Sequence, residues 1–172
     1  MKKVLCLLMA VILCVGLCAC DKVAYAKPIE AAIQITFYGN EDYLEFAAPE
    51  EYFEWYEDRY GEDFDDYCDD YWDDDQWVEY FGEEYDVTYE VSNEEKVDKD
   101  TLDDIKDCLE DKFDIDPSDV KKAYTFDVEY FIDGSDGNES SEWEEMYSVK
   151  IRNAWYMIDF DGEYIDFCYE AW

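Results

Sequence analysis

The sequence contains no histidine, and its only two arginines among 172 residues are Arg59 and Arg152. The absence of histidine removes the most common general base, the usual activating partner of a serine or cysteine nucleophile, and the most common metal ligand. Nothing in the sequence places either arginine beside a pair of carboxylates. We therefore predict that the protein is not an enzyme.

Positive charge is scarce in the whole chain, which has 13 lysines and arginines against 49 acidic residues and a net charge of −36. The first 19 residues contain two lysines and no acid, so the chain without them carries 11 − 49 = −38. Such a charge excludes nucleic acid as a partner, because binding there depends on neutralising phosphates. It also argues against a domain that lies flat on anionic lipid, where basic residues are needed.

Cys-x-x-Cys motifs, which are typical of metal sites, are also absent, although the chain has seven cysteines. Cys68, Cys108 and Cys168 are the three that lie beyond the first 20 residues. An odd number leaves two alternatives open: one disulfide with one free thiol, or three buried thiols that pack as small apolar side chains.

The N-terminus combines Lys2 and Lys3 with an uncharged apolar run from Val4 to Leu17. The run is shorter than the roughly 20 apolar residues that a membrane-spanning helix needs, but it fits the apolar region of a signal peptide. It ends in Leu17-Cys18-Ala19-Cys20, which resembles the lipobox at which bacterial lipoproteins are processed. An ordinary signal peptide or an uncleaved N-terminal anchor is the alternative.

The lipobox resemblance implies a signal peptide over residues 1–19 and a lipid, such as a palmitate-bearing diacylglyceryl group, on Cys20. Two acyl chains are sufficient for stable anchoring, whereas one is not. We therefore expect a lipid-anchored protein on the extracytoplasmic side of the cell membrane. Residues 20–27 then form the lipidated cysteine and a short tether, and residues 28–172 form a single α+β domain.

Aromatic residues are abundant: 6 tryptophans, 17 tyrosines and 10 phenylalanines supply a core in spite of the charge. Residues 43–85 hold more aromatic side chains than one buried helix face can use. We predict that some of them bind a partner, because tryptophan and tyrosine anchor interfaces. The candidates are Trp55, Tyr56, Trp72 and Trp77, with an envelope protein, a cationic peptide or a glycan as the partner. The alternative is that tyrosine rings are buried and only their hydroxyls reach water.

The segment from Glu62 to Asp75 is the most acidic, and its aromatic residues recur at the spacing of an amphipathic helix. Oxygen-rich clusters suit hard cations such as calcium or magnesium. The candidate metal ligands on the acidic face of this helix are Asp65, Asp66, Asp69, Asp70 and Asp73. The alternative is a solvated acidic face that binds no ion. No other cofactor is predicted.

Periodicity and capping residues predict further helices over residues 28–39, 40–46 and 49–61, with Gly39 and Gly61 as C-terminal caps. Residues 76–84 fit no pattern, and residues 85–91 alternate as a half-buried strand. Asp100 or Thr101 is expected to cap the next helix. Its inward face is formed by Leu102, Ile105, Leu109 and Phe113.

From Val120 onward the period changes to two, which indicates an antiparallel meander of about four strands. The first long strand is expected to carry Tyr124, Phe126, Val128, Tyr130 and Ile132 on one face. After a turn at 133–138, the return strand is expected to alternate through Trp143, Glu145, Tyr147, Val149 and Ile151. A turn at Arg152-Asn153 and a hairpin at Asp161-Gly162 complete the meander.

Three stretches carry a family resemblance: Val120-Lys121-Lys122-Ala123-Tyr124, Val149-Lys150-Ile151 and Ala154-Trp155-Tyr156. They resemble the cystatin-like, nuclear-transport-factor-2-like fold and, more narrowly, small lipoproteins of Gram-positive bacteria that carry such a domain. The resemblance implies an α+β fold with N-terminal helices packed in the concave face of a curved antiparallel sheet.

The predicted function is a lipid-anchored, non-catalytic binding or interaction module. The alternative is a calcium- or magnesium-responsive acidic envelope protein. A less favoured alternative is a small enzyme with a carboxylate dyad inside the cone formed by the sheet.

Overall fold

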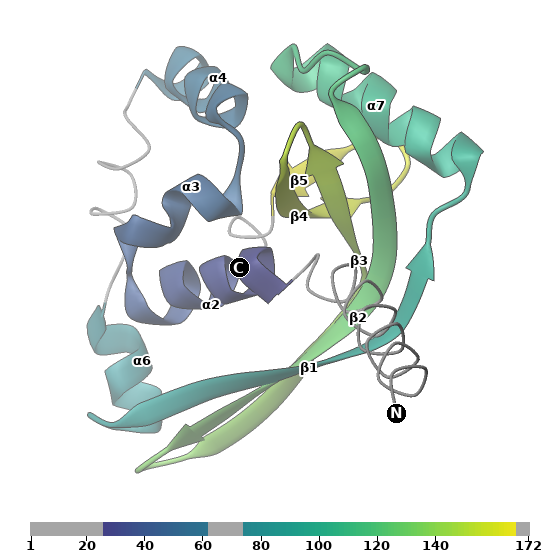
Figure 1. Ribbon diagram of the computed structural model, residues 1–172. Coiled ribbons are helices and arrows are strands. Elements are labelled where there is room, and N and C mark those ends of the chain that lie inside the picture. The colour runs from purple at the N-terminus through teal and green to yellow at the C-terminus, as the bar shows by residue number, and fades with distance from the viewer. Residues whose placement is uncertain (1–25, 62–73, 168–172) are drawn as a thin grey trace, which may run out of the picture.

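A computed structural model describes residues 26–61 and 74–167 and shows an α+β protein in which N-terminal helices contact an open antiparallel sheet (Figure 1). The helical elements are α2 (Ala26–Tyr38), a short 3-10 turn (Glu41–Tyr43), α3 (Leu44–Ala47), α4 (Glu50–Tyr60), α6 (Asp74–Phe81) and α7 (Lys99–Phe113). The strands are β1 (Tyr85–Lys96), β2 (Val120–Gly134), β3 (Asn138–Ile151), β4 (Ala154–Phe160) and β5 (Ile165–Phe167).

Most predicted helix boundaries are confirmed, and the cap of α7 is corrected. Pro49 precedes α4, and Gly61 follows it with a φ of 71°, a conformation that glycine adopts without strain. The cap of α7 is Asp98 and not Asp100 or Thr101, because the Asp98 carboxylate accepts a hydrogen bond of 2.9 Å from the Thr101 backbone N–H. Both predicted caps lie inside the first turn of the helix.

The sheet has the strand order β1-β2-β3-β4-β5, and every neighbouring pair is antiparallel. The predicted meander is therefore confirmed. Two predictions were incomplete, because β1 extends past Val91 to Lys96 and α6 occupies much of the segment that fitted no pattern.

Two β-bulges bend the sheet at the level of Asp127. The registers of β1 and β3 against β2 each shift by one residue there, at Asn93–Glu94 and at Glu144–Glu145. Asn93 and Glu145 have positive φ angles of 53° and 54°. The Asp127 carboxylate accepts hydrogen bonds from the Asn93 side-chain amide at 2.5 Å and from the Glu145 backbone N–H at 2.9 Å. One side chain thus holds both bulges.

The bulge on β3 corrects the predicted alternation along that strand. The extra residue changes which side chains point to a given face, so Trp143 and Tyr147 lie on opposite faces. Met146 is consequently buried, whereas Glu145 is exposed.

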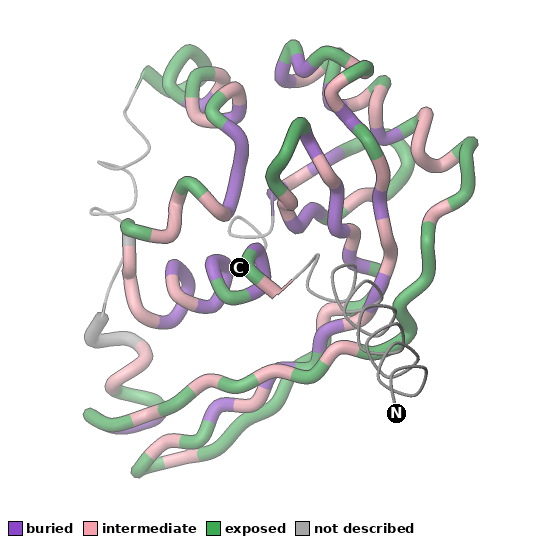
Figure 2. Tube along the Cα trace, in the orientation of Figure 1, coloured by how far each residue is buried: buried purple, intermediate pink, exposed green. Residues whose placement is uncertain are grey.

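The two halves of the sheet bury opposite faces. Between Asp127 and the β2–β3 turn, Val128, Tyr130 and Ile132 pack against α2 and Phe81, as does Phe126 just before Asp127. On the other side of the bend, Ala123 and Val149 point to the opposite face, where they pack against α7 and α4. Figure 2 shows buried residues alternating with half-buried and exposed ones along these strands.

Several predictions fall on residues that the structure does not describe. These are the signal peptide and lipobox, the acidic helix of residues 62–75 up to Asp73, and the pairing of Cys68 and Cys168. Cys108 is a free, half-buried cysteine. Within residues 26–61 and 74–167, no helix is long and apolar enough to cross a membrane.

Candidate functional site

The exposed face of the β1–β3 ribbon, on the side away from α2, carries carboxylates that lie directly opposite one another. Glu90 pairs in register with Glu129, and Glu129 pairs with Glu142, so three carboxylates form one row across three strands. Asp86 and Asp133 form a second like-charged pair two rungs away. We call these five exposed residues the acidic ribbon.

Like charges directly opposite each other in a sheet are destabilising. In the described part of the chain, no lysine or arginine forms an ion pair with any residue of the acidic ribbon. The strands therefore present uncompensated negative charge to solvent in a fixed geometry.

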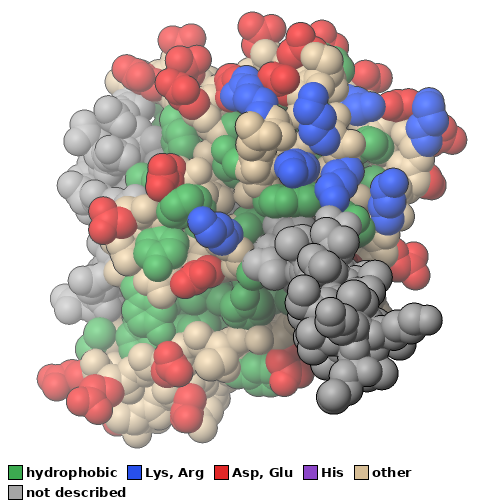
Figure 3. Space-filling model, in the orientation of Figure 1, with side chains coloured by type: hydrophobic (Ala, Val, Ile, Leu, Met, Phe, Trp, Pro, Cys, Tyr) green, Lys and Arg blue, Asp and Glu red, His purple; other side chains and the backbone are tan. Residues whose placement is uncertain are grey.

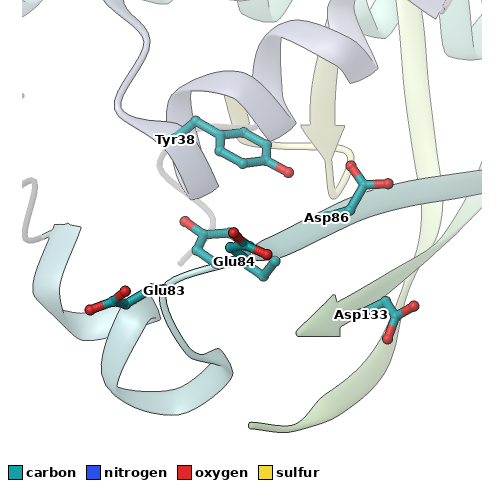
Figure 4. A pocket seen from close by; sticks show the side chains of 6 residues that line it. Tyr38, Glu83, Glu84, Asp86 and Asp133 are labelled. Atoms are coloured by element: carbon teal, nitrogen blue, oxygen red, sulfur yellow. The ribbon is translucent and has the colours of Figure 1, made fainter. Parts of the chain in front are cut away.

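A pocket of about 480 Å³ opens at the end of the acidic ribbon, where the C-terminal end of α2 meets the start of β1 (Figure 4). Its lining residues are Tyr38, Glu83, Glu84, Tyr85, Asp86 and Asp133. In Figure 4, Asp86 lies on the side of the Tyr38 hydroxyl, and Glu83 points away from it. The pocket thus combines four carboxylates with two aromatic rings and no basic side chain.

The two tyrosines of the pocket are rigid parts of its wall. Their rings stack with centroids 5.4 Å apart and planes 7° apart. The Tyr38 hydroxyl accepts a 3.0 Å hydrogen bond from the Val87 backbone N–H, and the Tyr85 hydroxyl donates to the Phe37 carbonyl. Burial raises the pKa of Tyr38, so its hydroxyl stays neutral. The exposed parts of such rings attract cations.

The loop between α6 and β1 is fixed against the β2–β3 turn. Backbone N–H groups of Asp136 and Ser135 donate to the carbonyls of Phe81 and Glu84, each at 3.1 Å. Gly134 allows this approach, since a Cβ there would lie 2.3 Å from the Phe81 carbonyl oxygen. Two of the four carboxylates of the pocket, Glu83 and Glu84, are therefore carried by a well-supported loop.

The predicted partner residues on α4 contribute mainly to packing. Tyr56 is buried in the core between α4 and α7. Trp55 is half-buried against Phe113, and the cationic groups of Lys112 and Arg59 lie 4.9 and 5.3 Å from its ring centroid. The chain's own cations thus occupy positions that a cationic partner would take.

The predicted partner residue on α6 is a bridge between helices. The Trp77 indole N–H donates a 3.0 Å hydrogen bond to the Thr36 carbonyl, and its ring packs 4.9 Å from that of Phe37. Trp72 lies outside the described residues, and so do the five candidate metal ligands Asp65, Asp66, Asp69, Asp70 and Asp73. Among the residues that the structure describes, no group of three or more acidic or cysteine side chains converges on one point where a metal ion could sit.

Arg152 does lie beside two carboxylates, although it does not line the pocket described above. Its guanidinium bonds to Glu51 and, at 2.9 Å, to Asp119, and thereby ties α4 to the segment that enters β2. The hydrogen bond from Arg152 lowers the pKa of Glu51, so this carboxyl stays ionised. The cluster is therefore an ion-pair tie between α4 and the start of β2.

The acidic ribbon was not predicted from the sequence, although one signal was present. In the predicted half-buried strand of residues 85–91, Asp86, Thr88 and Glu90 alternate with Val87, Tyr89 and Val91 and so share one face. Only the strand registers show that the acids lie directly opposite one another, and the register of β1 against β2 is set across the connection that contains α7, not by a hairpin turn.

A comparison with known protein families, curated proteins and solved structures finds no match for this chain. The function proposed below therefore rests on the described residues alone.

Proposed function

We propose that the protein is a lipid-anchored, extracytoplasmic and non-catalytic binding module that takes an extended cationic ligand, such as a basic peptide segment, along the acidic ribbon and its pocket. The observation that carries this proposal is the in-register row of Glu90, Glu129 and Glu142 beside the Asp86–Asp133 pair. The anchor rests on the lipobox that ends at Cys20.

The spacing favours a ligand with distributed charge over a single metal ion. Calcium needs several oxygen ligands at about 2.3–2.6 Å from one point. Cross-strand neighbours in a sheet are instead about 4.5–5.5 Å apart at Cβ, and successive rungs on one face are about 6.8 Å apart. An extended peptide with lysines at alternate positions repeats at that same distance. The calcium- or magnesium-responsive alternative thus depends on residues 62–73, and no described carboxylate pair favours the enzymatic one.

We also propose that the domain has a cystatin-like, nuclear-transport-factor-2-like fold. Support comes from the helix-then-meander order and from the way the sheet curves around α2 (Figure 1). The fold does not by itself assign a ligand.

The ligand proposal is tested with a synthetic peptide of alternating lysine and serine, titrated by calorimetry against the Cys20→Ser chain. The double variant Glu129→Gln/Asp133→Asn removes the two central ribbon carboxylates and should weaken binding by about fivefold or more, because each exposed ion pair contributes up to about 1 kcal/mol. The matched control Glu57→Gln/Asp58→Asn, on the exposed surface of α4, should leave binding unchanged. Equal losses in both variants would contradict a defined site.

The anchor is tested in cells. Cys20→Ser should release the protein from the membrane fraction into the medium, because no acyl chain can then be attached. Retention of this variant at the membrane would overturn the anchoring proposal.

A further inference from the structure

A surface of positively charged side chains lies at the end of the sheet away from the acidic ribbon, on the face that α7 does not cover. Register places Lys96 opposite Tyr124 and Lys150 between Lys122 and Trp155. These side chains all point away from Ala123 and Val149, which pack toward α7. We call the set of Lys96, Lys122, Tyr124, Lys150 and Trp155 the lysine platform.

The platform is preorganised by contacts between its own members. The Lys122 ammonium lies 5.2 Å from the Trp155 ring centroid and 5.6 Å from that of Tyr124, and the Lys150 ammonium lies 5.7 Å from Trp155. The two rings are 5.9 Å apart. Among the described residues, neither Lys96 nor Lys150 forms an ion pair. Like-charged lysines on neighbouring strands repel each other, and an anionic surface would relieve that repulsion.

Basic side chains gather on one part of the surface. Figure 3 shows most of the lysine and arginine side chains of this view over the upper right, where the ends of β2, β3 and β4 lie, with carboxylates around them along the top and right edges and further carboxylates at the lower end. The acidic ribbon points to the other face of the sheet and lies on the far side of the Asp127 bulges. A net charge of −36 therefore does not describe the field at the platform.

We infer that the lysine platform docks on anionic lipid headgroups and thereby sets the orientation of the anchored domain, with the acidic ribbon turned away from the bilayer. The inference rests on the lipid anchor of the proposed function. Tryptophan and tyrosine favour the membrane interface, where the ring is partly buried and the polar atom stays wet. Lysines near an anionic leaflet each contribute attraction of about 1 kcal/mol, or roughly fivefold in binding.

The tether and the ionic strength both permit this contact. Cys20 precedes Ala26 by six residues, which reach about 20 Å when extended. Ala26 begins α2, and α2 contacts β4, the strand that carries Trp155. At physiological ionic strength charges are screened within about 8 Å, so carboxylates on distant faces repel the bilayer only weakly. The anchor also raises the local concentration, so a weak contact is sufficient.

The test uses the full lipidated chain, purified from bacterial membranes and reconstituted on vesicles of phosphatidylcholine with or without phosphatidylglycerol. Flotation reports anchoring, and the acetylation rate of each lysine, read by mass spectrometry, reports contact. Phosphatidylglycerol should slow acetylation of Lys96, Lys122 and Lys150 by about fivefold or more. Lys112, which packs against β5 on the other face, should keep its rate.

Matched variants separate the platform from the anchor. The double variant Lys122→Gln/Lys150→Gln should still float with both kinds of vesicle, but phosphatidylglycerol should no longer slow the acetylation of its Lys96. The control variant Lys99→Gln should behave as the wild type. Equal acetylation rates on both vesicles for a chain that floats would overturn the platform inference and leave the anchor intact. A wild-type chain that floats on neither vesicle would contradict the anchor and this inference with it. If soluble polyphosphate slowed acetylation of the platform lysines and phosphatidylglycerol did not, the assignment of the ligand as lipid would be overturned.

Discussion

The two halves of the sheet are built from the same long strands, yet they expose opposite faces with opposite charge. Between the β2–β3 turn and Asp127, one face packs on α2 and the other carries the acidic ribbon. Beyond Asp127, the second face packs on α7 and α4, and the first carries the lysine platform. The bulges at Asn93 and Glu145 lie where the two halves meet.

This difference shows how a chain of extreme net charge can still present two distinct surfaces. Cross-strand register collects residues that are far apart in sequence, such as Lys96, Lys122 and Lys150. Average charge predicts solubility and long-range repulsion, but not the field at a contact. We propose on this basis that each half recognises a partner of opposite charge.

The largest expected effect on stability comes from truncating a fully buried side chain in either core. Leu109→Ala in the α7 half and Ile29→Ala in the α2 half should each lower the free energy of unfolding by about 2–5 kcal/mol, because both side chains are fully buried. Since β2 and β3 run through both cores, urea unfolding followed by tryptophan fluorescence and by circular dichroism should give one coincident transition. Two separate transitions would show that the halves fold independently.

Removal of the Asp127 carboxylate, whose two hydrogen bonds hold both bulges, should have the next largest effect on stability. Asp127→Ala should cost about 1–2 kcal/mol near pH 7, because hydrogen bonds to a charged group are lost. The Asn93 amide, followed by the Glu145 N–H, lowers the pKa of Asp127 below its unfolded value, so this stabilisation is present above the unfolded pKa and lost as pH falls through the folded one.

The difference in melting temperature between the wild type and Asp127→Ala should therefore narrow as the pH falls below the usual aspartate pKa of about 3.9 and through the lowered pKa of the folded state. Glu139→Ala, at an exposed position on β3, should differ little from the wild type at either pH. A gap between wild type and Asp127→Ala that is constant with pH would rule out an ionised Asp127 as the bulge acceptor.

A smaller effect is expected where α6 joins the acidic half. Trp77→Phe keeps most ring contacts but loses the hydrogen bond to the Thr36 carbonyl, which should cost about 1 kcal/mol. Thermal unfolding measures the loss, and the lysine–serine peptide should bind as before. Weaker peptide binding with unchanged stability would instead support the prediction that Trp77 contacts the partner.

The smallest expected effect is a gain in stability. Glu145 holds a φ of 54°, which is unfavourable for a residue with a side chain, so Glu145→Gly should stabilise the bend by about 0.5–1 kcal/mol. Asn93 has nearly the same φ but tolerates it better, so Asn93→Gly should gain less and should also lose the bond to Asp127. A loss of stability in Glu145→Gly would show that the side chain itself supports the bulge.

The sequence predicted what depends on short-range pattern. The meander followed from alternation and from Asp161-Gly162, and α4 followed from Pro49 and Gly61. The bulges were missed because the alternation of Trp143, Glu145 and Tyr147 continues unbroken through the extra residue. Both charged surfaces were missed because they exist only after strands pair, and each of their residues looks like an ordinary exposed position along its own strand.

Backbone chemical-shift mapping of the Cys20→Ser chain with the lysine–serine peptide tests the central claim most directly, namely that the two halves of the sheet recognise opposite charges. The predicted result is that saturable shifts are confined to the acidic half, at Asp86, Glu90, Glu129 and their neighbours, with none at Lys122, Lys150 or Trp155. Shifts spread evenly over exposed acids on α4, α7 and the ribbon would contradict it, because the peptide would then respond only to net charge.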